Sequence, residues 1–227
     1  MMKQYFETKK KYPDTILMFR LGDFYEMFFD DAVTASRELE LVLTGRACGQ
    51  EERAPMCGVP FHSADSYMAR LVAKGYKVAI CEQMEDPALA KGLVKREVVR
   101  VLTPGTVIEN SMLNEGRNNF LASVYFAGES AGVCFIDVST GSVNLTELAA
   151  PALPDKIINE IGRFMPSEIV FNSASSSLAK VFSFISNKTE ALAQELGDNY
   201  FDPQSSAEII LRHFKKDSLS ELELNET

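Results

Sequence analysis

The sequence predicts an α/β protein of two domains. Its 227 residues exceed the ~100 to 150 residues of a typical single domain and fit two modest ones. Strand-like and helix-like segments alternate in the first half, with short glycine- or proline-containing breaks. In the second half, strand-like runs come first and a helix follows. The hydrophobic content of 46% and the charged content of 24% are typical of chains that fold around buried cores.

The first half contains nine predicted segments. In chain order we expect a helix over 2–12, a strand over 15–21, a helix over 23–39, a strand over 41–44, a loop over 45–54, a helix over 64–74, a strand over 77–83, a turn or short helix over 86–92 and a strand over 98–102. Pro13, Gly22 and Gly75 separate neighbouring elements, because proline and glycine interrupt regular structure. The helix over 23–39 is predicted from apolar residues at helical spacing, namely Phe24, Met27, Phe28, Ala32 and Ala35.

A stretch without periodicity marks the domain boundary. We assign residues 1–110 to the first domain, 111–118 to a linker and 119–227 to the second domain. Runs over 120–126, 132–138 and 142–148, joined by short turns, predict an antiparallel meander, and a helix over 154–165 and a strand over 168–171 follow. The charged residues 218–227 end without a covering element, so we expect the second domain to be truncated within a larger protein.

Composition excludes several classes of protein. The longest apolar runs are far shorter than the ~18 residues that a membrane-spanning helix needs. The N-terminus has no apolar block before a cleavage site, so a cytoplasmic protein without a membrane partner is expected. The four cysteines form no CxxC pair, which disfavours both a disulfide scaffold and a zinc site.

Charge is distributed unevenly along the chain. Up to residue 110 there are 15 Lys and Arg against 16 Asp and Glu, a net charge of −1, and from 111 onward 8 against 16, a net charge of −8. Affinity for nucleic-acid backbones depends on Lys and Arg that displace condensed counterions. Any contact with nucleic acid is therefore expected in the first half, and the acidic second half is typical of a spacer or a protein-contact module.

The sequence contains no recognisable catalytic motif. Phosphate-binding loops, dinucleotide-binding turns, nucleophile elbows and the HExxH pattern are all missing, and the two histidines are His62 and His213. We therefore expect a chain that is not itself an enzyme and that holds no cofactor or metal.

The segment MFRLGDFYEMFF over 18–29 has two interpretations. In the first, Asp23 caps a helix, Glu26 completes a capping box, and Phe24 and Phe28 pack inward. In the second, Phe24 projects from the turn, where its ring could stack on a base or wedge a base step, and Glu26 accepts a hydrogen bond from a base edge.

The motifs of the first half carry a family resemblance. They are GDFYEMF over 22–28, LTGR over 43–46, PMCGVPFH over 55–62, KVAICEQMEDP over 77–87 and KREVVRVLTPGT over 95–106. In this order they resemble the N-terminal mismatch-recognition domain of the MutS family of DNA mismatch repair proteins. NFLASVYF over 119–126 and FIDVSTG over 135–141 are similar to the connector domain of that family, more loosely and with a likeness that fades after residue 200.

The resemblance implies a fold and a function. It implies a mixed α/β mismatch-recognition domain followed by a ribonuclease H-like α/β connector domain. The family motif Phe-x-Glu falls on Phe24, which inserts beside a mispaired base, and on Glu26, which hydrogen-bonds that base. Arg46, Lys95 and Arg96 lie where the family has basic residues near DNA, and we expect them to contact the backbone, with a solvated surface charge as the alternative.

The resemblance also implies partners outside this chain. The connector relays signals to clamp and ATPase domains and contacts MutL, while ATP, Mg²⁺ and the homodimer belong to the full-length protein. Two alternatives remain: a protein-interaction module without independent DNA binding, and a metal-dependent nuclease built around Asp137. The nuclease is disfavoured because two-metal chemistry needs several carboxylates and Asp137 is the one acidic residue on an early core strand.

Overall fold

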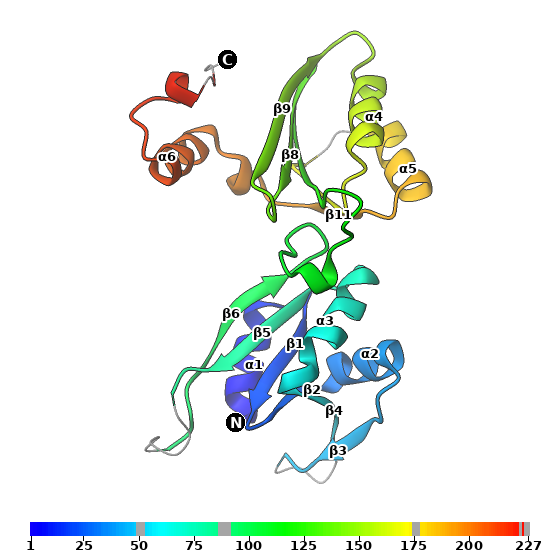
Figure 1. The fold of residues 1–227 in the computed structure, drawn as a ribbon, viewed down its shortest axis with the longest axis vertical. Coiled ribbons are helices and arrows are strands. Elements are labelled where there is room, and N and C mark those ends of the chain that lie inside the picture. The colour runs from blue at the N-terminus through cyan, green and yellow to red at the C-terminus, as the bar shows by residue number, and fades with distance from the viewer. Residues whose placement is uncertain (49–52, 86–91, 174–177, 223, 225–227) are drawn as a thin grey trace. The chain divides into compact units, whose positions relative to one another are not determined.

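The computed structural model describes residues 1–48, 53–85, 92–173, 178–222 and 224. The chain divides into two compact units (Figure 1). Unit 1 contains Met1–Asn119 together with Asp137–Gly141, and unit 2 contains Phe120–Ile136 together with Ser142–Thr227.

Unit 1 is built on a mixed six-stranded sheet in the order β3-β4-β2-β1-β5-β6. Its strands are β1 Ile16–Leu21, β2 Phe24–Phe28, β3 Thr44–Arg46, β4 Ala54–Pro60, β5 Val78–Gln83 and β6 Arg96–Leu102. β1 and β5 are parallel, and the other neighbouring strands pair antiparallel. Consequently β1, β4 and β5 end, and β2 and β6 begin, at the same end of the sheet.

Helices cover both faces of this sheet. The helix α1, Met2–Lys11, packs on one face, where Tyr5 lies among Leu17, Phe19 and Phe28. The helices α2, Phe29–Leu39, and α3, Ala64–Ala73, pack on the opposite face with the larger core cluster. Short 3₁₀ turns at Phe61–Ser63 and Asn110–Met112 complete the unit. The three layers confirm the predicted α/β class.

The helix predicted over 23–39 is wrong in its first third. Gly22, with φ +59°, turns the chain, and Phe24–Phe28 returns antiparallel to β1 as β2. The helix begins only at Phe29, and its N-cap residue Phe28 makes no side-chain cap. The capping box of Asp23 and Glu26 is therefore also wrong, because both residues precede the helix.

Two further strands differ from the prediction. β3 occupies residues 44–46 instead of 41–44, so that Gly45 and Arg46 lie in a strand and not in the predicted loop. β4 was not predicted at all, since a run containing two prolines and a glycine has low strand propensity. It forms because it lies between β2 and β3 and pairs with both. The turn or short helix predicted over 86–92 falls mostly outside the described residues.

Unit 2 has a five-stranded sheet in the order β11-β10-β7-β8-β9. Its strands are β7 Leu121–Ala127, β8 Ser130–Asp137, β9 Ser142–Ala149, β10 Glu168–Phe171 and β11 Leu192–Glu195, and its helices are α4 Leu153–Phe164, α5 Ala179–Lys188 and α6 Pro203–Phe214, with 3₁₀ turns at Asp198–Phe201 and Leu219–Leu222. β7 and β8 are antiparallel, whereas β10 is parallel to both of its neighbours.

The core of unit 2 lies between the sheet and two helices. Ile157 and Ile161 of α4 and Val181 of α5 are buried against alternate residues of β7 and β8. The three strands predicted after the boundary, the helix over 154–165 and the strand over 168–171 are all present, each within about two residues of its predicted bounds, an ordinary disagreement at element ends.

Candidate nucleic-acid interface

Phe24 is exposed where the β1–β2 hairpin turns. It is the first residue of β2, and 46% of its surface is accessible although the side chain is a large aromatic one. Side chains alternate across a strand, so Phe24 and Glu26 share one face while Tyr25 and Met27 point to the other. Tyr25 and Met27 are buried in the larger core, which fixes the strand's register. The fold therefore holds Phe24 outward on a rigid strand.

Tyr25 anchors the hairpin from its buried side. Its hydroxyl donates a hydrogen bond to Glu82 on β5. Burial raises the pKa of Tyr25 well above its ordinary value, and the neighbouring Glu82 carboxylate raises it further. Tyr25 thus remains a protonated donor and leaves the exposed position to Phe24.

A second aromatic side chain lies beside this turn. Phe61 follows β4 directly, its amide donates to the carbonyl of Asp23 at 2.8 Å, and 47% of its surface is exposed. The guanidinium of Arg20 covers its ring, and Arg20 Nε also donates to the carbonyl of Gly22 at 2.5 Å. Sequence analysis assigned Phe61 no role, although it lies within the motif PMCGVPFH that carried the family resemblance.

Glu26 is paired with Arg46. The Arg46 guanidinium donates to Oε2 of Glu26, whose side chain is 16% exposed, while that of Arg46 is 38% exposed. The two residues belong to β2 and β3, which are separated by β4. The structure therefore brings together two residues predicted to contact DNA in different ways, the base and the backbone.

Lys95 and Arg96 lie near the start of β6, and they differ sharply in solvent exposure. The side chain of Lys95 is 66% exposed and pairs with Glu97 at 2.7 Å. Arg96 is 9% exposed, and its guanidinium donates to the carbonyls of Arg20 and Val94 and to the side chain of Gln4. Burial lowers the pKa of Arg96. The backbone contact predicted for Arg96 is not supported by this placement, because its hydrogen-bonding groups stabilise the domain interior.

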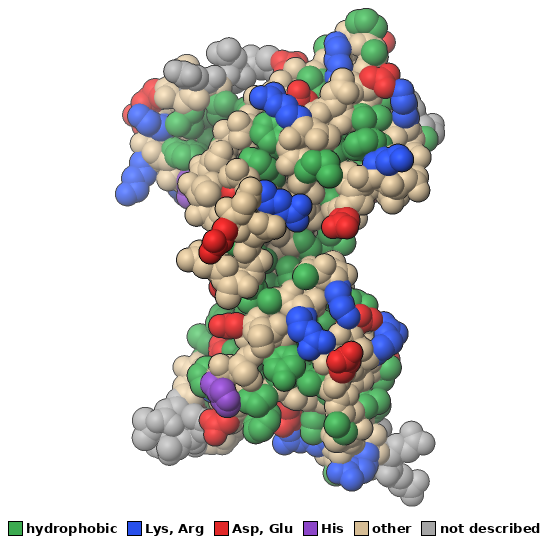
Figure 2. Space-filling view, turned by 45° about the vertical axis from the view of Figure 1, so that its right-hand side comes forward, with side chains coloured by type: hydrophobic (Ala, Val, Ile, Leu, Met, Phe, Trp, Pro, Cys, Tyr) green, Lys and Arg blue, Asp and Glu red, His purple; other side chains and the backbone are tan. Residues whose placement is uncertain are grey.

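Charge on the surface of unit 1 is mixed. On the face shown in Figure 2, acidic side chains lie among the basic ones over the described residues and no unbroken basic patch forms. This agrees with the net charge of −1 over residues 1–110. A surface of mixed charge supplies little non-specific attraction to phosphates.

Comparison with known proteins identifies the family. Sequence profiles of MutS domain I and MutS domain II match residues 1–111 and 119–227. The chain belongs to the MutS family. The DNA mismatch repair protein MutS of Ruminiclostridium cellulolyticum is 52% identical over 220 residues, which are 97% of this chain and 25% of that protein.

Two other relatives support the same family assignment. MutS of Lachnoclostridium phytofermentans is 49% identical over 226 residues, which are 100% of this chain and 24% of that protein. MutS of Caldanaerobacter subterraneus is also 49% identical over 226 residues, covering 26% of its length. The chain thus spans about a quarter of the curated relatives that it matches. Phe24, Glu26, Arg46, Lys95 and Arg96 all lie within the match to MutS domain I.

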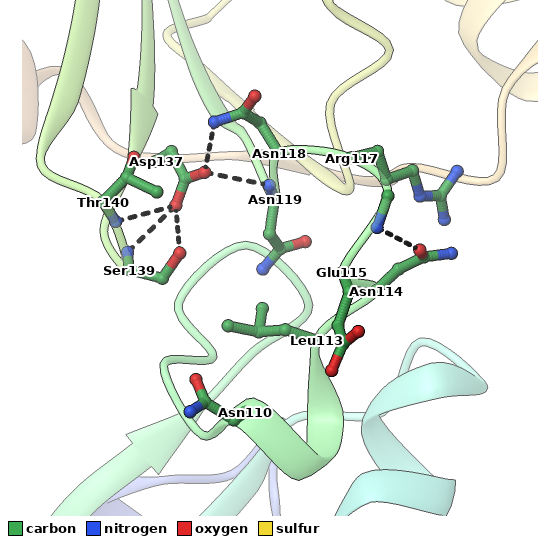
Figure 3. A pocket seen from close by; sticks show the side chains of 11 residues that line it. Asn110, Leu113, Asn114, Glu115, Arg117, Asn118, Asn119, Asp137, Ser139 and Thr140 are labelled. Atoms are coloured by element: carbon green, nitrogen blue, oxygen red, sulfur yellow. Dashed lines mark hydrogen bonds between the residues drawn. The ribbon is translucent and has the colours of Figure 1, made fainter.

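Asp137, at the end of β8 in the MutS domain II match, has a structural role. Its Oδ2 accepts from the Asn118 amide at 2.8 Å and the Asn119 backbone at 3.2 Å (Figure 3). Its Oδ1 accepts from the hydroxyl and backbone of Ser139 and from the backbone of Thr140. Burial raises the pKa of Asp137, but these hydrogen bonds outweigh burial and lower it to about 2.

One other carboxylate lies near Asp137 among the described residues. A pocket of about 340 Å³ beside it is lined by residues of unit 1, mostly amides and hydroxyls, with Glu115 as the other carboxylate. Across the part of the chain that the structure describes, no group of three or more His, Cys, Asp or Glu could hold a metal ion. The same residues include no helix long and apolar enough to cross a membrane.

Proposed function

We propose that this chain recognises mispaired or unpaired bases in duplex DNA during DNA mismatch repair. The observation that carries the proposal is Phe24, an aromatic side chain 46% exposed at the start of β2, with Glu26 two residues further on the same face of the strand. Support also comes from the match of residues 1–111 to MutS domain I. In this account, Phe24 stacks on or wedges beside the abnormal base and Glu26 hydrogen-bonds it.

The physical chemistry of a mismatch favours such a probe. Opening a base step costs a few kcal/mol, and least where the base is mispaired or unpaired, so the wedge enters there first. Stacking of an aromatic ring on a base contributes about 1 to 3 kcal/mol whatever the base, because every base has a π-face. One phenylalanine can therefore detect many different mispairs. Glu26 then adds a hydrogen bond to a base N–H, or to a purine acceptor if the carboxyl group is protonated.

Binding of the complete gene product to two duplexes tests this proposal. One duplex carries a single unpaired thymine, and its control is fully paired. Phe24→Ala should remove the preference for the unpaired thymine and leave the affinity for the paired duplex unchanged. The matched control is Phe214→Ala, which removes an equally exposed phenylalanine, 53% accessible, from the end of α6. Retained preference in Phe24→Ala would refute the role of the aromatic ring.

Unit 2 is proposed to act through protein contacts. Its net charge is strongly negative, and large apolar side chains are exposed on β9 and α6, among them Val143, Leu145 and Ile209. We propose that this connector relays recognition to clamp and ATPase domains of the full-length protein and contacts MutL. The second candidate function, a protein-interaction module with no DNA binding of its own in this chain, rests on the same surface. ATP, Mg²⁺ and the homodimer are assigned to the full-length protein, and no catalytic centre is assigned to this chain.

A further inference from the structure

The ion pair between Glu26 and Arg46 crosses a strand. Glu26 lies on β2 directly opposite Gly58 of β4, whereas Arg46 lies on β3 opposite Ala54, further along β4 on the same face, so the ion pair crosses β4 diagonally. Partners across an antiparallel pair share a face, so the Glu26 side chain extends over the backbone of β4 to meet the guanidinium. The pair joins two strands that are not hydrogen-bonded to each other.

Gly58 provides the space for this crossing. A Cβ atom at position 58 would lie 3.4 Å from Cγ of Glu26 and 3.3 Å from the carbonyl oxygen of Tyr25. The contact with the Tyr25 carbonyl is tighter than most contacts of a Cβ atom, and the contact with Cγ of Glu26 is a close van der Waals contact. An alanine at position 58 would therefore crowd the strand beside Glu26, and a longer side chain would extend into the path of the Glu26 side chain. The path from Glu26 to Arg46 therefore depends on a residue without a side chain in the intervening strand.

The pairing engages one half of the carboxylate. Arg46 donates to Oε2, and no described residue donates a hydrogen bond to Oε1. A carboxylate has about four acceptor sites, so the free oxygen can still accept a base N–H. We propose that Arg46 is a positioning residue for Glu26: it holds Oε2 through the ion pair across β4, fixes the direction of Oε1, and offsets the carboxylate's negative charge near DNA.

This inference rests on the proposed function, and it replaces the expectation that Arg46 contacts the DNA backbone. A basic residue on the DNA backbone binds every sequence alike, because phosphates carry no sequence information. A residue that orients the base-reading carboxylate acts on discrimination instead. The second role agrees better with the structure, because the Arg46 guanidinium already donates to a carboxylate that is itself largely covered.

A double-mutant cycle in the complete gene product tests the coupling. The measured quantity is the ratio of affinities for the unpaired-thymine duplex and the paired duplex, for wild type, Arg46→Met, Glu26→Ala and the double variant. Loss of one hydrogen-bonded partner should lower this ratio by about tenfold in each single variant. Because both changes remove the same interaction, the double variant should be no worse than Glu26→Ala alone. Effects that multiply would overturn the proposal.

Salt dependence separates positioning from backbone contact. Lys95→Met is the matched control, since Lys95 is an exposed basic residue whose predicted role is a phosphate contact. Loss of a phosphate contact weakens binding to both duplexes and reduces the slope of log affinity against log salt by about 1. Arg46→Met should leave the slope and the affinity for paired DNA unchanged. A reduced slope with an unchanged ratio would overturn the positioning role.

Gly58→Ala offers an independent variant that alters no charge. It should lower the affinity ratio while Arg46 and Glu26 are both intact, and an unchanged ratio would overturn the proposed path over β4. Thermal unfolding of each variant identifies any that fails to fold, and Arg46→Lys, which keeps the charge, should recover part of the affinity ratio.

If Phe24→Ala also leaves the preference for the unpaired-thymine duplex intact, the proposed function itself fails. If Phe24 and Glu26 matter while Arg46 acts independently, this inference alone fails.

Discussion

The guanidinium of Arg20 lies 3.7 Å from the centre of the Phe61 ring, and through this contact the turn after β1 is joined to the end of β4. Arg20 also donates to the carbonyl of Gly22 and lies 3.8 Å from the Glu82 carboxylate. One side chain thus links three of the strand ends that surround Phe24. In the proposed function Phe24 acts as a wedge, and a wedge can separate stacked bases only if its own support does not yield. We therefore expect this bracing to contribute to recognition.

Removal of that bracing should be measurable as a loss of stability. Arg20→Met is expected to lower the free energy of unfolding by about 1 to 2 kcal/mol, because it removes a cation–π contact and a charged hydrogen bond. Denaturant titration of the chain measures the change. Arg37→Met is the control, since Arg37 has 67% of its side chain exposed and forms its ion pair with its sequence neighbour Glu38. Equal losses in the two variants would show that Arg20 is an ordinary surface residue.

Asp137 should make the protein sensitive to acid. Its pKa is about 2 in the folded protein, below the ordinary value of 3.8. A lowered pKa means that the folded state favours the ionised form, so the stabilisation is complete above about pH 4 and is lost as the pH falls towards 2. The difference corresponds to about 2 kcal/mol. Unfolding measured against pH should therefore be steeper in wild type than in Asp137→Asn.

The pH dependence of unfolding in wild type and Asp137→Asn could also contradict this prediction. Parallel pH profiles for the two proteins would mean that the hydrogen bonds from Asn118 and Ser139 do not favour the ionised carboxylate. Asp202→Asn serves as the control, because Asp202 caps α6 through one residue, Ser205, and is exposed.

The buried tyrosines should resist ionisation. Of the seven tyrosines, Tyr5 and Tyr25 have pKa values raised mainly by burial, with contributions from Asp31 and Glu82 respectively. Near-ultraviolet absorbance through about pH 10, the ordinary tyrosine pKa, should show fewer tyrosinates in the folded chain than in the unfolded chain. Tyr25→Phe should leave the folded amplitude unchanged, because Tyr25 stays protonated in the folded chain at this pH. A lower amplitude in Tyr25→Phe would contradict the inward orientation.

The chain alone should bind DNA weakly. Its net charge is −9, and the basic residues of unit 1 are largely matched by acidic ones. Without further basic domains, affinity at ~0.15 M salt should be no better than micromolar for either duplex. Fluorescence anisotropy with labelled duplexes measures it directly. Nanomolar binding by the isolated chain would show that unit 1 carries its own phosphate contacts.

Much of the fold was predictable because its signals are local. Gly75 ends α3, apolar runs form β1 and β5, and spaced isoleucines form α4. The segment after Gly22 was misread because Phe24, Met27 and Phe28 fit a helical period. The segment also satisfies a strand in which Tyr25 and Met27 enter one core and Phe28 enters the other. Helix and strand periods coincide over so few residues, and pairing with β1 and β4 decides between them.

The candidate site was predictable only in part. Phe24 and Glu26 could be predicted as site residues because the motif that carries them is continuous. The ion pair between Glu26 and Arg46 could not be predicted, since the two residues are 20 positions apart in the sequence. Their approach also depends on β4, which contains Pro55 and Gly58 and was not predicted from the sequence. The burial of Arg96 could not be predicted either, because a basic residue beside Lys95 and Glu97 resembles a surface charge, and only the packed structure shows it buried.

The central claim is that the Phe24 ring stacks on the abnormal base. The most direct measurement places the fluorescent base 2-aminopurine at the unpaired position of a duplex and records its emission on binding of the complete gene product. We predict quenching by wild type, and no quenching by Phe24→Leu, which keeps an apolar side chain but not the π-face. Equal quenching by both proteins would contradict the account, because the base would then be quenched without the aromatic ring.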